Sequence, residues 1–278
     1  MRRHCLRMLA TNVFRQRRHK CYNFEMKKFE IIIFDIDGTL TRSKQSLESE
    51  MAELISQLLK KYKVAIISGA SYKQFEWQIL ASLNCDSEEL KNLYLLPVDG
   101  TVLCVYQGGW QCKDSETLST DEKEMIKKAF ENVFEKSGLD KPEKIYGELI
   151  EDRGAQLNFS ALGQNAPIEF KESWDPLNTK REKVILALKQ ILPNFSMRIG
   201  GTTSIEITKT DIDKGYGIER LARELSIPKE EMLYVGDKIF KGGNDEPALR
   251  LGLQYKAVKN LEETKEVITE LLKLKEVL

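Results

Sequence analysis

Short apolar runs alternate with amphipathic stretches along the first hundred residues. Residues 30–34 form a β-branched apolar run of the kind that makes a strand buried on both faces. Residues 47–61 carry apolar side chains at three- and four-residue spacing, which predicts a helix, and 64–67 predicts a second buried strand. A helix around 71–80 and a third strand at 93–96 follow. This order predicts a parallel α/β unit.

The pattern changes after Gly100, and the next hundred residues predict an antiparallel sheet with helices on one face. Glycine pairs stand where two hairpins would turn, at Gly108 and Gly109 and at Gly200 and Gly201. The expected elements are a hairpin at 101–112, a helix at 121–136, strands near 145–150 and 155–160, a helix at about 178–191 and a hairpin at 197–207.

The first pattern returns from Lys214. A helix to about Leu225, a strand at 232–235, a short helix after Asn244, a strand at 255–258 and a final helix are expected. The parallel core is therefore interrupted in the sequence. The interrupting segment would lie over the strand ends, where α/β folds bind ligands.

The predicted fold class is α/β, with a Rossmann-like parallel-sheet core and an inserted α+β cap domain. We expect the core at 26–109 and 211–278 and the inserted domain at 110–210. Residues 1–25 form a basic arm that is typical of a transit peptide or a nucleic-acid-binding tail. Because Met26 stands just before the first apolar run, we interpret the arm as an upstream extension from a misassigned start, outside the fold.

Composition and charge narrow the classes of function. The chain has 278 residues, of which 41% are hydrophobic and 31% charged, so it has enough apolar material for packed cores and is expected to be globular. Lys plus Arg equals Asp plus Glu, at 43 each, yet the arm holds six Arg and one Lys against only Glu25. The remaining chain is mildly acidic, which argues against nucleic acid as a partner.

The positions of the histidines and cysteines exclude further kinds of site. Both histidines, His4 and His19, lie in the arm, so His-based triads and His-ligated metals are excluded from the folded body. The five cysteines form no C-x-x-C pair, which argues against a zinc ribbon or a redox motif and favours a reducing compartment. No apolar run approaches the roughly 18 to 20 residues of a membrane span. We expect a cytoplasmic protein with no membrane partner.

Two carboxylates follow the first predicted strand, in the sequence DIDGT at 35–39. Asp35 and Asp37 are separated by one residue and point to different sides, so one can attack phosphorus while the other acts as general acid and base. Ser68, at the end of the second strand, can donate a hydrogen bond to a phosphoryl oxygen. Lys214 can neutralise the charge that grows on a transferring phosphoryl group. Together these residues predict phosphoryl transfer.

An acidic segment follows the strand at 232–235. Asp237 comes directly after that strand, and Asn244 with Asp245 extends the cluster. Hard cations prefer such oxygen ligands, so the segment predicts a site for a divalent cation.

The order of these motifs resembles the haloacid dehalogenase-like (HAD) phosphohydrolase superfamily, and the insertion resembles its larger α/β cap class, type IIB. The resemblance implies that Asp35 is the nucleophile, that Asp37 is the acid and base, and that Ser68 and Lys214 bind the phosphoryl group. It also implies a Mg²⁺ cofactor. The implied metal site comprises Asp35, Asp37 through its carbonyl, Asp237, Asn244 and Asp245.

Within the superfamily the chain resembles the eukaryotic-type phosphomannomutases, from about Phe29 to the C-terminal helix. The segments that carry this resemblance are GDKIFKGGND (236–245), RGAQLNFSALG (153–163), IEF (168–170) and IGGTTSIEI (199–207). The resemblance implies conversion of mannose 6-phosphate to mannose 1-phosphate, in GDP-mannose biosynthesis, and leaves open a homodimer through the cap. The implied substrate-binding residues of the cap are Arg153, Asn158, Ser204 and Glu206.

The chain departs from that family in the cap. Gln164 and Pro167 stand where family members carry arginines, and Glu206 stands where they carry Asp. A sugar-phosphate phosphatase without mutase activity is therefore the main alternative, and a catalytically silent binding protein is a remote one. The cations that could replace the missing charge are Lys171, Lys180, Arg181 and Arg198.

Overall fold

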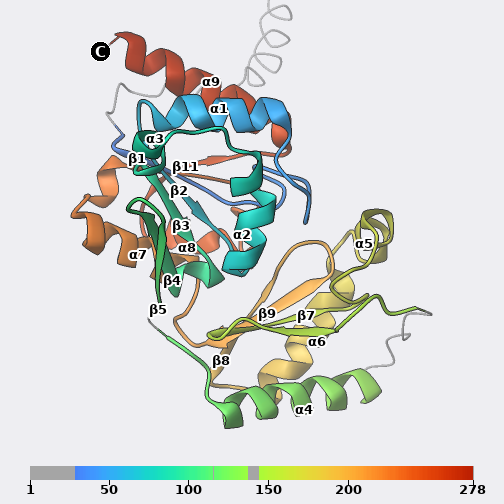
Figure 1. Cartoon of the computed structure of the whole chain (residues 1–278). Coiled ribbons are helices and arrows are strands. Elements are labelled where there is room, and N and C mark those ends of the chain that lie inside the picture. The colour runs from blue at the N-terminus through green and yellow to red at the C-terminus, as the bar shows by residue number, and fades with distance from the viewer. Residues whose placement is uncertain (1–28, 115, 137–143, 278) are drawn as a thin grey trace, which may run out of the picture.

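The computed structural model describes residues 29–114, 116–136 and 144–277, which form two sheets with helices around each (Figure 1). The larger sheet has the strand order β11-β10-β1-β2-β3-β4-β5. An antiparallel hairpin of β4 (Val102–Tyr106) and β5 (Trp110–Asp114) forms one edge. The parallel strands are β1 (Ile31–Phe34), β2 (Lys63–Ile67), β3 (Leu93–Leu96), β10 (Met232–Gly236) and β11 (Gln254–Ala257).

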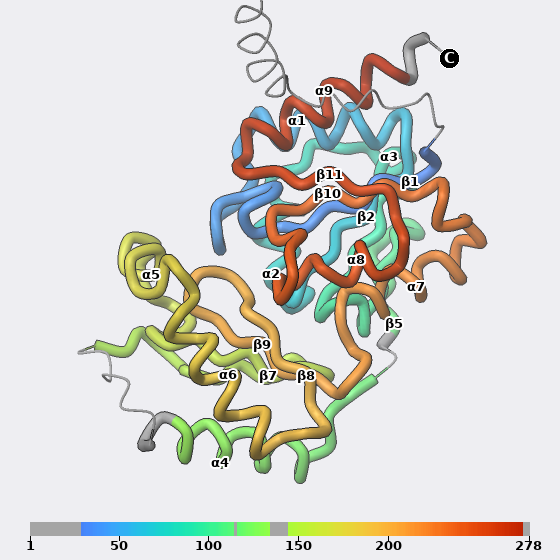
Figure 2. Tube along the Cα trace, turned by 180° about the vertical axis from the view of Figure 1, so that it is seen from behind, coloured from blue at the N-terminus to red at the C-terminus, as the bar shows by residue number. Residues whose placement is uncertain are grey.

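Helices cover both faces of this sheet, so β1 is buried on both sides as its sequence predicts. Ile32 and Phe34 pack with α1 (Ser49–Leu59), α2 (Tyr72–Gln78) and α9 (Leu261–Val277). Ile31 and Ile33 pack on the opposite face. That face is covered by α7 (Lys214–Leu225) and the short α8 (Glu246–Arg250). Seen from behind, α9 runs beside α1 (Figure 2).

The smaller sheet is antiparallel, in the order β6-β7-β9-β8. Its helices α4 (Thr120–Lys136) and α6 (Thr179–Ile191) share one hydrophobic core with the sheet and lie on the face away from the larger sheet (Figure 1). The other face looks toward the larger sheet. Its strands are β6 (Ile150–Asp152), β7 (Gln156–Ser160), β8 (Phe195–Ile199) and β9 (Ser204–Lys209).

The α/β fold class is confirmed, but one strand lies elsewhere than expected. The strand predicted near 145–150 is found at Ile150–Asp152, and the residues before it form a loop. In this loop Gly147 adopts a φ of +79°, and the amide of Tyr146 donates to the carbonyl of Leu162 rather than to a sheet partner. The segment between β7 and α6 contains the short helix α5 (Ile168–Trp174), which the sequence pattern did not predict.

The β4–β5 hairpin belongs to the larger sheet. Cys104 of β4 pairs with Leu95 of β3, and its buried side chain packs among the helices of that sheet. The larger sheet thus continues to Asp114, past the domain boundary expected at residue 110. The smaller sheet is made only of strands between 150 and 209, within the expected insertion.

Two cysteines are joined in the hairpin, which the prediction of a reducing compartment did not anticipate. Cys104 and Cys112 are direct cross-strand partners and form a disulfide, with their Cα atoms 4.0 Å apart. Both lie four residues from Gly108, where the hairpin turns, so symmetry about this glycine was the signal in the sequence. Cys85 is a free thiol.

Two further expectations concern the basic arm and membrane-spanning segments. The basic arm at 1–25 lies outside the described residues. None of the described helices is both long and apolar enough to cross a membrane.

Candidate active site

Lys214 lies between two buried carboxylates at the carboxyl edge of the larger sheet. Its Nζ donates to Asp35 Oδ1 and, over 2.6 Å, to Asp245 Oδ1. Tyr234 donates its hydroxyl proton to the same oxygen of Asp245 over 2.5 Å. The sheet places these groups together: Asp35 ends β1, Tyr234 lies in the adjacent strand β10, and Lys214 begins α7. The sequence predicted the roles of Asp35 and Lys214 but not that of Tyr234.

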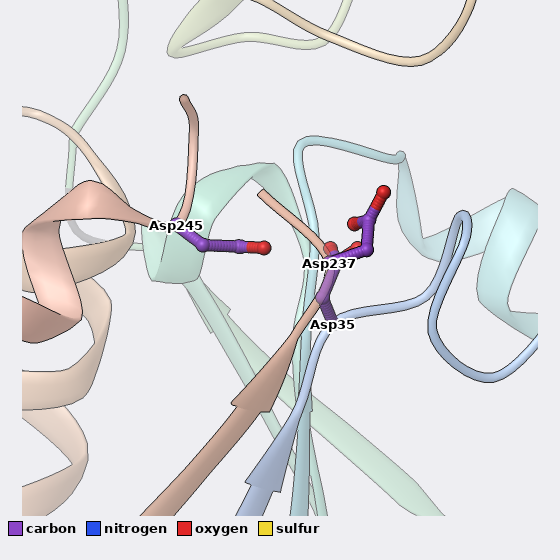
Figure 3. Close-up of side chains that lie close together, drawn as sticks. All are labelled: Asp35, Asp237 and Asp245. Atoms are coloured by element: carbon purple, nitrogen blue, oxygen red, sulfur yellow. The ribbon is translucent and has the colours of Figure 1, made fainter. Parts of the chain in front are cut away.

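Three carboxylates meet at this point. Asp35, Asp237 and Asp245 each have one oxygen within 4.8 Å of the others (Figure 3). Asp237 Oδ1 and Asn244 Oδ1 are buried and have no hydrogen-bond partner among the described residues. Buried polar atoms are normally satisfied, and oxygen ligands are those that Mg²⁺ prefers. These residues therefore fit a divalent cation.

Electrostatics of the cluster also favour a cation. Burial raises the pKa of Asp35 well above its ordinary value, against the lowering effect of Lys214. Burial likewise raises the pKa of Asp237. For Lys214 burial acts in the opposite sense, but Asp245 and Asp35 outweigh it and hold its pKa well above the usual range. The ammonium thus stays charged. The raised pKa values of Asp35 and Asp237 reflect the cost of burying their negative charge, which a divalent ion would offset.

Asp37 is not part of this group of three carboxylates, because the chain bends directly after β1 and its side chain binds other groups. Its Oδ1 accepts from the backbone amide of Lys44 at 3.0 Å and from Gln78 Nε2 at 2.9 Å. Gly38 permits the tight exit between the two aspartates, because it adopts a φ of +94° and an added Cβ would lie 2.5 Å from Asp237 Oδ2. The carboxyl of Asp37 is thus held by the loop after β1 and by α2, outside the group of three carboxylates.

A polar pocket beside Asp37 joins the core to the inserted domain. Ser68 lies in it at the end of β2, and its Oγ accepts from the amide of Ala70 at 3.2 Å. The structure brings the predicted cap residues to the same pocket, whose lining includes Asp37, Ser68, Arg153, Asn158, Ser204 and Glu206.

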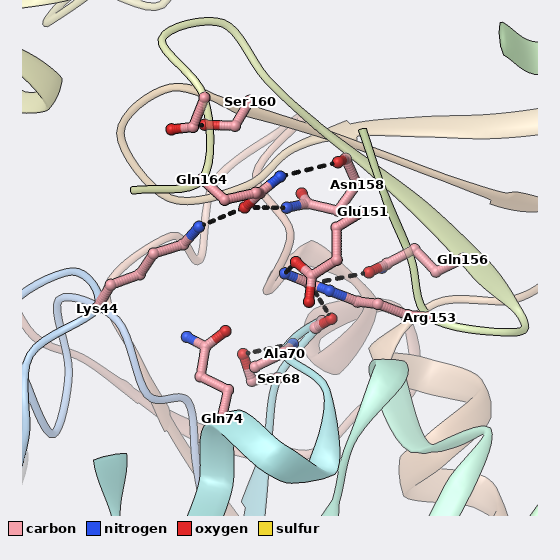
Figure 4. A network of polar contacts seen from close by, with 12 residues as sticks. Lys44, Ser68, Ala70, Gln74, Glu151, Arg153, Gln156, Asn158, Ser160 and Gln164 are labelled. Atoms are coloured by element: carbon pink, nitrogen blue, oxygen red, sulfur yellow. Dashed lines mark hydrogen bonds and ion pairs between the residues drawn. The ribbon is translucent and has the colours of Figure 1, made fainter. Parts of the chain in front are cut away.

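Arg153 is engaged by the protein itself. Its Nη1 donates to the carbonyl of Gly69 in the core, and its Nη2 donates to Glu151 Oε2 at 2.6 Å (Figure 4). Glu206 Oε2 and Asn158 Oδ1, by contrast, are buried without a partner among the described residues. A bound ligand with hydroxyl groups would satisfy them.

Two lysines supply positive charge around Gln164. Lys44 Nζ, from the loop after β1, donates to Gln164 Oε1 at 2.7 Å (Figure 4). Lys171 Nζ donates to the backbone carbonyl of Gln164 at 3.1 Å. Burial, followed by the charges of Lys171 and Arg153, lowers the pKa of Lys44 to about 8. Lys44 was missed in the sequence because only the fold brings its loop to the cap. Its place shortly after DIDGT was the available signal.

The other cations considered as replacement charge are not among the residues that line this pocket. Arg181 is buried in an ion pair with Asp175 at 3.0 Å and also donates to the carbonyl of Gly200. Lys180 lies over the ring of Trp174. Arg198 pairs with Asp213 instead of facing a ligand. Neighbouring groups of the cap and the core hold these three side chains, while Arg181 also lines a neighbouring pocket that contains Asp37 and Asp237. The expectation that they supply replacement charge stays a prediction.

Asp99 is a further buried carboxyl at the boundary of core and cap that the sequence did not reveal. It follows β3 with a φ of +54°, and its Oδ2 accepts from Gln156 Nε2 of β7 at 3.1 Å. Burial and then the nearby Glu206 raise its pKa to about 7. The contact surface between core and cap therefore contains the acidic side chains of Asp99 and Glu206 close to each other.

The fold and this arrangement define an α/β phosphotransferase or hydrolase. The chain belongs to the haloacid dehalogenase-like hydrolase family, whose sequence profile matches residues 32–251. The family identifies the chain as an enzyme and not as a catalytically silent binding protein.

Similar proteins of known sequence are phosphomannomutases. Phosphomannomutase 2 of Dictyostelium discoideum is 28% identical over 227 residues, which cover 78% of this chain and 86% of that protein. The phosphomannomutase of Schizosaccharomyces pombe is 27% identical over 229 residues, covering 80% of this chain and 86% of its own length.

Solved structures confirm the fold. An N-terminally truncated IMP-nucleotidase of Plasmodium falciparum superposes with a TM-score of 0.68 at 21% identity, covering 90% of this chain and 72% of that one. The protein SMU.1108c of Streptococcus mutans gives a TM-score of 0.57 at 16% identity, with 88% of this chain and all of that one covered.

Proposed function

We propose that this enzyme transfers a phosphoryl group within a hexose phosphate through an aspartyl-phosphate on Asp35, as a phosphomannomutase-like isomerase that converts mannose 6-phosphate to mannose 1-phosphate. The observation that carries the proposal is the pair of lysines, Lys44 and Lys171, on either side of Gln164. Their ammonium groups lie beside Gln164 of the cap. The cap is where the phosphate that does not react at Asp35 has to be held in a bisphosphate intermediate. The phosphomannomutase relatives support the same substrate class.

The proposed cycle starts from a hexose 1,6-bisphosphate. A carboxylate oxygen of Asp35 attacks the phosphorus of one phosphate, the bond between that phosphorus and its sugar oxygen breaks, and the carboxyl of Asp37 gives its proton to the leaving oxygen, so that a hexose monophosphate departs and Asp35 carries the phosphoryl group. Lys214 and the hydroxyl of Ser68 would hold phosphoryl oxygens during the transfer. In the return step Asp37 takes a proton from the free 1-hydroxyl of mannose 6-phosphate, the oxygen attacks the aspartyl-phosphate, the bond to Asp35 breaks and the bisphosphate forms again. After the bisphosphate turns, transfer of its 6-phosphate to Asp35 releases mannose 1-phosphate.

A Mg²⁺ ion fits this scheme at Asp35, Asp237 and Asn244, with Asp245 beside them. When bound, it would neutralise charge on the transferring phosphoryl group. Asp245 already accepts from Lys214, Tyr234 and the amide of Lys238. We therefore assign Asp245 to orienting Lys214 and the acidic loop, and Asp237 and Asn244 to direct contact with the ion.

A sugar-phosphate phosphatase is the second candidate, and the geometry of Arg153 favours it. Its two terminal nitrogens already donate to Glu151, Gly69 and Gln156, and only Nε has no partner among the described residues, so a fork of two terminal nitrogens is not available to a distal phosphate unless these bonds break. An Arg fork binds phosphate more strongly than a lysine does. If the lysines cannot hold the intermediate long enough for it to turn, water becomes the acceptor and free phosphate is the product.

One experiment separates the two reactions. The enzyme receives mannose 1-phosphate, Mg²⁺ and a trace of hexose 1,6-bisphosphate, and mannose 6-phosphate and free phosphate are measured separately. A dominant 6-phosphate product would support the mutase. Free phosphate alone, unchanged by added bisphosphate, would refute it and leave the phosphatase. Asp35→Asn is the control, because an amide cannot act as the anionic nucleophile, so both products should disappear while the melting temperature stays near that of the parent.

Cytoplasmic location and a homodimer through the cap belong to this proposal as well. Both rest on the resemblance to phosphomannomutases. Gel filtration of the enzyme, before and after an aspartate is placed on the exposed Leu186 of α6, would test the dimer.

A further inference from the structure

Asp213 stands directly before Lys214 and connects three parts of the molecule. It is the N-cap of α7, and its Oδ1 accepts from the amide of Tyr216 at 3.2 Å. Its Oδ2 accepts from Arg198 Nη2 at 2.8 Å and from Arg250 Nη2 at 2.6 Å. Arg198 belongs to β8 of the inserted domain, whereas Arg250 ends α8 of the core. One buried carboxylate thus receives an arginine from each domain.

Strand β8 touches the catalytic elements at two places. Arg198 Nη1 also reaches the carbonyl of Ile212 at 3.4 Å, so its guanidinium spans two consecutive residues before Lys214. The neighbouring Ile199 forms a bridge with Gly243, the residue before Asn244. A strand of the cap therefore lies against both the start of α7 and the loop that carries the acidic cluster.

The two arginines differ in what they can contribute. The side chain of Arg250 is 63% exposed, so its pair with Asp213 is screened by solvent. The side chain of Arg198 is 20% exposed, and the carboxylate it meets is 2% exposed. The charge-assisted hydrogen bond from Arg198 to Asp213 has little contact with solvent, so it is the stronger of the two, and its geometry is specific.

On these contacts we propose that Arg198 is a positioning residue, which docks strand β8 on the segment before Lys214 and so holds the cap over the active site. In this position Lys171, Asn158 and Glu206 face the core. Without Arg198, Asp213 keeps Arg250 and its capping bond, so α7 and Lys214 retain their support. What is lost is the tie between β8 and the segment before Lys214, while the contacts of Arg153 with Gly69 and of Gln156 with Asp99 remain. This inference rests on the proposed function insofar as the substrate has a sugar that the cap must contact.

The test compares Arg198→Ala with the matched control Arg250→Ala, which removes the other arginine from the same oxygen but leaves the cap contact. Each variant is assayed with mannose 1-phosphate and with p-nitrophenyl phosphate, a small substrate without a sugar. We expect Arg198→Ala to lower kcat/KM for the sugar phosphate about tenfold, mainly through KM, and to change p-nitrophenyl phosphate turnover by less than about twofold. Arg250→Ala should change both by less than about twofold.

Two results would overturn the proposal. If Arg198→Ala slows both substrates equally, or neither, Arg198 does not act through the cap. If Arg250→Ala has the same effect as Arg198→Ala, the cause is the shared carboxylate and not the docking of β8.

Hydrogen exchange provides a readout that needs no sugar substrate. If the parent enzyme acts on p-nitrophenyl phosphate but on no hexose phosphate, the proposed function fails and the docking is still testable. Amides of β8 and of residues 210–213 should then exchange faster in Arg198→Ala than in Arg250→Ala. Equal exchange in the two variants would refute the docking.

Discussion

Lys44 shows how a single residue can acquire a role that its own segment does not reveal. It follows the DIDGT motif in a loop and adopts a φ of +52°, yet its amine ends beside Gln164 of the inserted domain. The residues of the motif itself could be proposed from sequence because their place depends only on the end of β1, which the structure confirms. Lys44, Tyr234 and Asp99 could not be identified in this way, since their partners come from segments that only the tertiary fold brings near.

The lowered pKa of Lys44 leads to a prediction about pH. With a pKa of about 8 in the free enzyme, the amine is charged below that pH and neutral above it. Because only the ammonium attracts a phosphate, kcat/KM for the sugar phosphate should fall as pH rises through about 8. Arg stays charged over this range, so Lys44→Arg should remove the fall. Identical pH profiles for the two proteins between pH 7 and pH 9 would show that Lys44 does not contact the substrate phosphate.

At the scale of elements, strands whose burial pattern is simple were predicted well and loops poorly. β1, β2, β3 and β10 are apolar runs buried on both faces, and each was found where its sequence placed it. The failure at 145–150 has a local cause, because Gly147 and the bond from Tyr146 to Leu162 turn that segment into a loop. The hairpin of β4 and β5 was recognised, but pairing of β4 with β3 decides its sheet, and hairpin sequence alone does not contain that pairing.

The disulfide of this hairpin should contribute to stability. Cys104 is buried and Cys112 is exposed, so Cys112→Ser removes the crosslink with little loss of packing. For so short a loop we expect a loss of about 2 kcal/mol in the free energy of unfolding. A thiol reductant should lower the melting temperature of the parent to that of Cys112→Ser and leave the variant unchanged. A parent insensitive to reductant would show that the crosslink is absent or does not stabilise the fold.

At the scale of the whole molecule, core and cap meet through polar groups around Asp99. The folded protein favours protonated Asp99, since burial and the charge of Glu206 raise its pKa to about 7. The charged groups around it also include Lys214, Arg198 and Asp213. The stabilisation from this raised pKa is complete below the unfolded pKa of about 4 and is lost as pH rises through about 7.

Replacing Asp99 by a side chain that cannot ionise should therefore stabilise the folded protein at alkaline pH. Asp99→Asn cannot ionise, can still accept from Gln156, and suits the positive φ of this position. Its melting temperature should exceed that of the parent at pH 8, and the difference should shrink toward pH 5. A difference that is constant across this range would mean that ionisation of Asp99 does not oppose contact between core and cap.

The position of β1 between β10 and β2 affects the order in which the chain can fold during its synthesis. The cap has a hydrophobic core of its own, from Leu118 to Ile207, and its sequence leaves the ribosome before β10 exists. The larger sheet, by contrast, waits for its last two strands, and Lys214 meets Asp35 across 179 residues of sequence. Domains generally fold as units, and contacts between distant segments form late. We therefore expect nascent chains to carry a folded cap on an unfinished core, so that catalytic competence arises only after β10 and β11 have been synthesised.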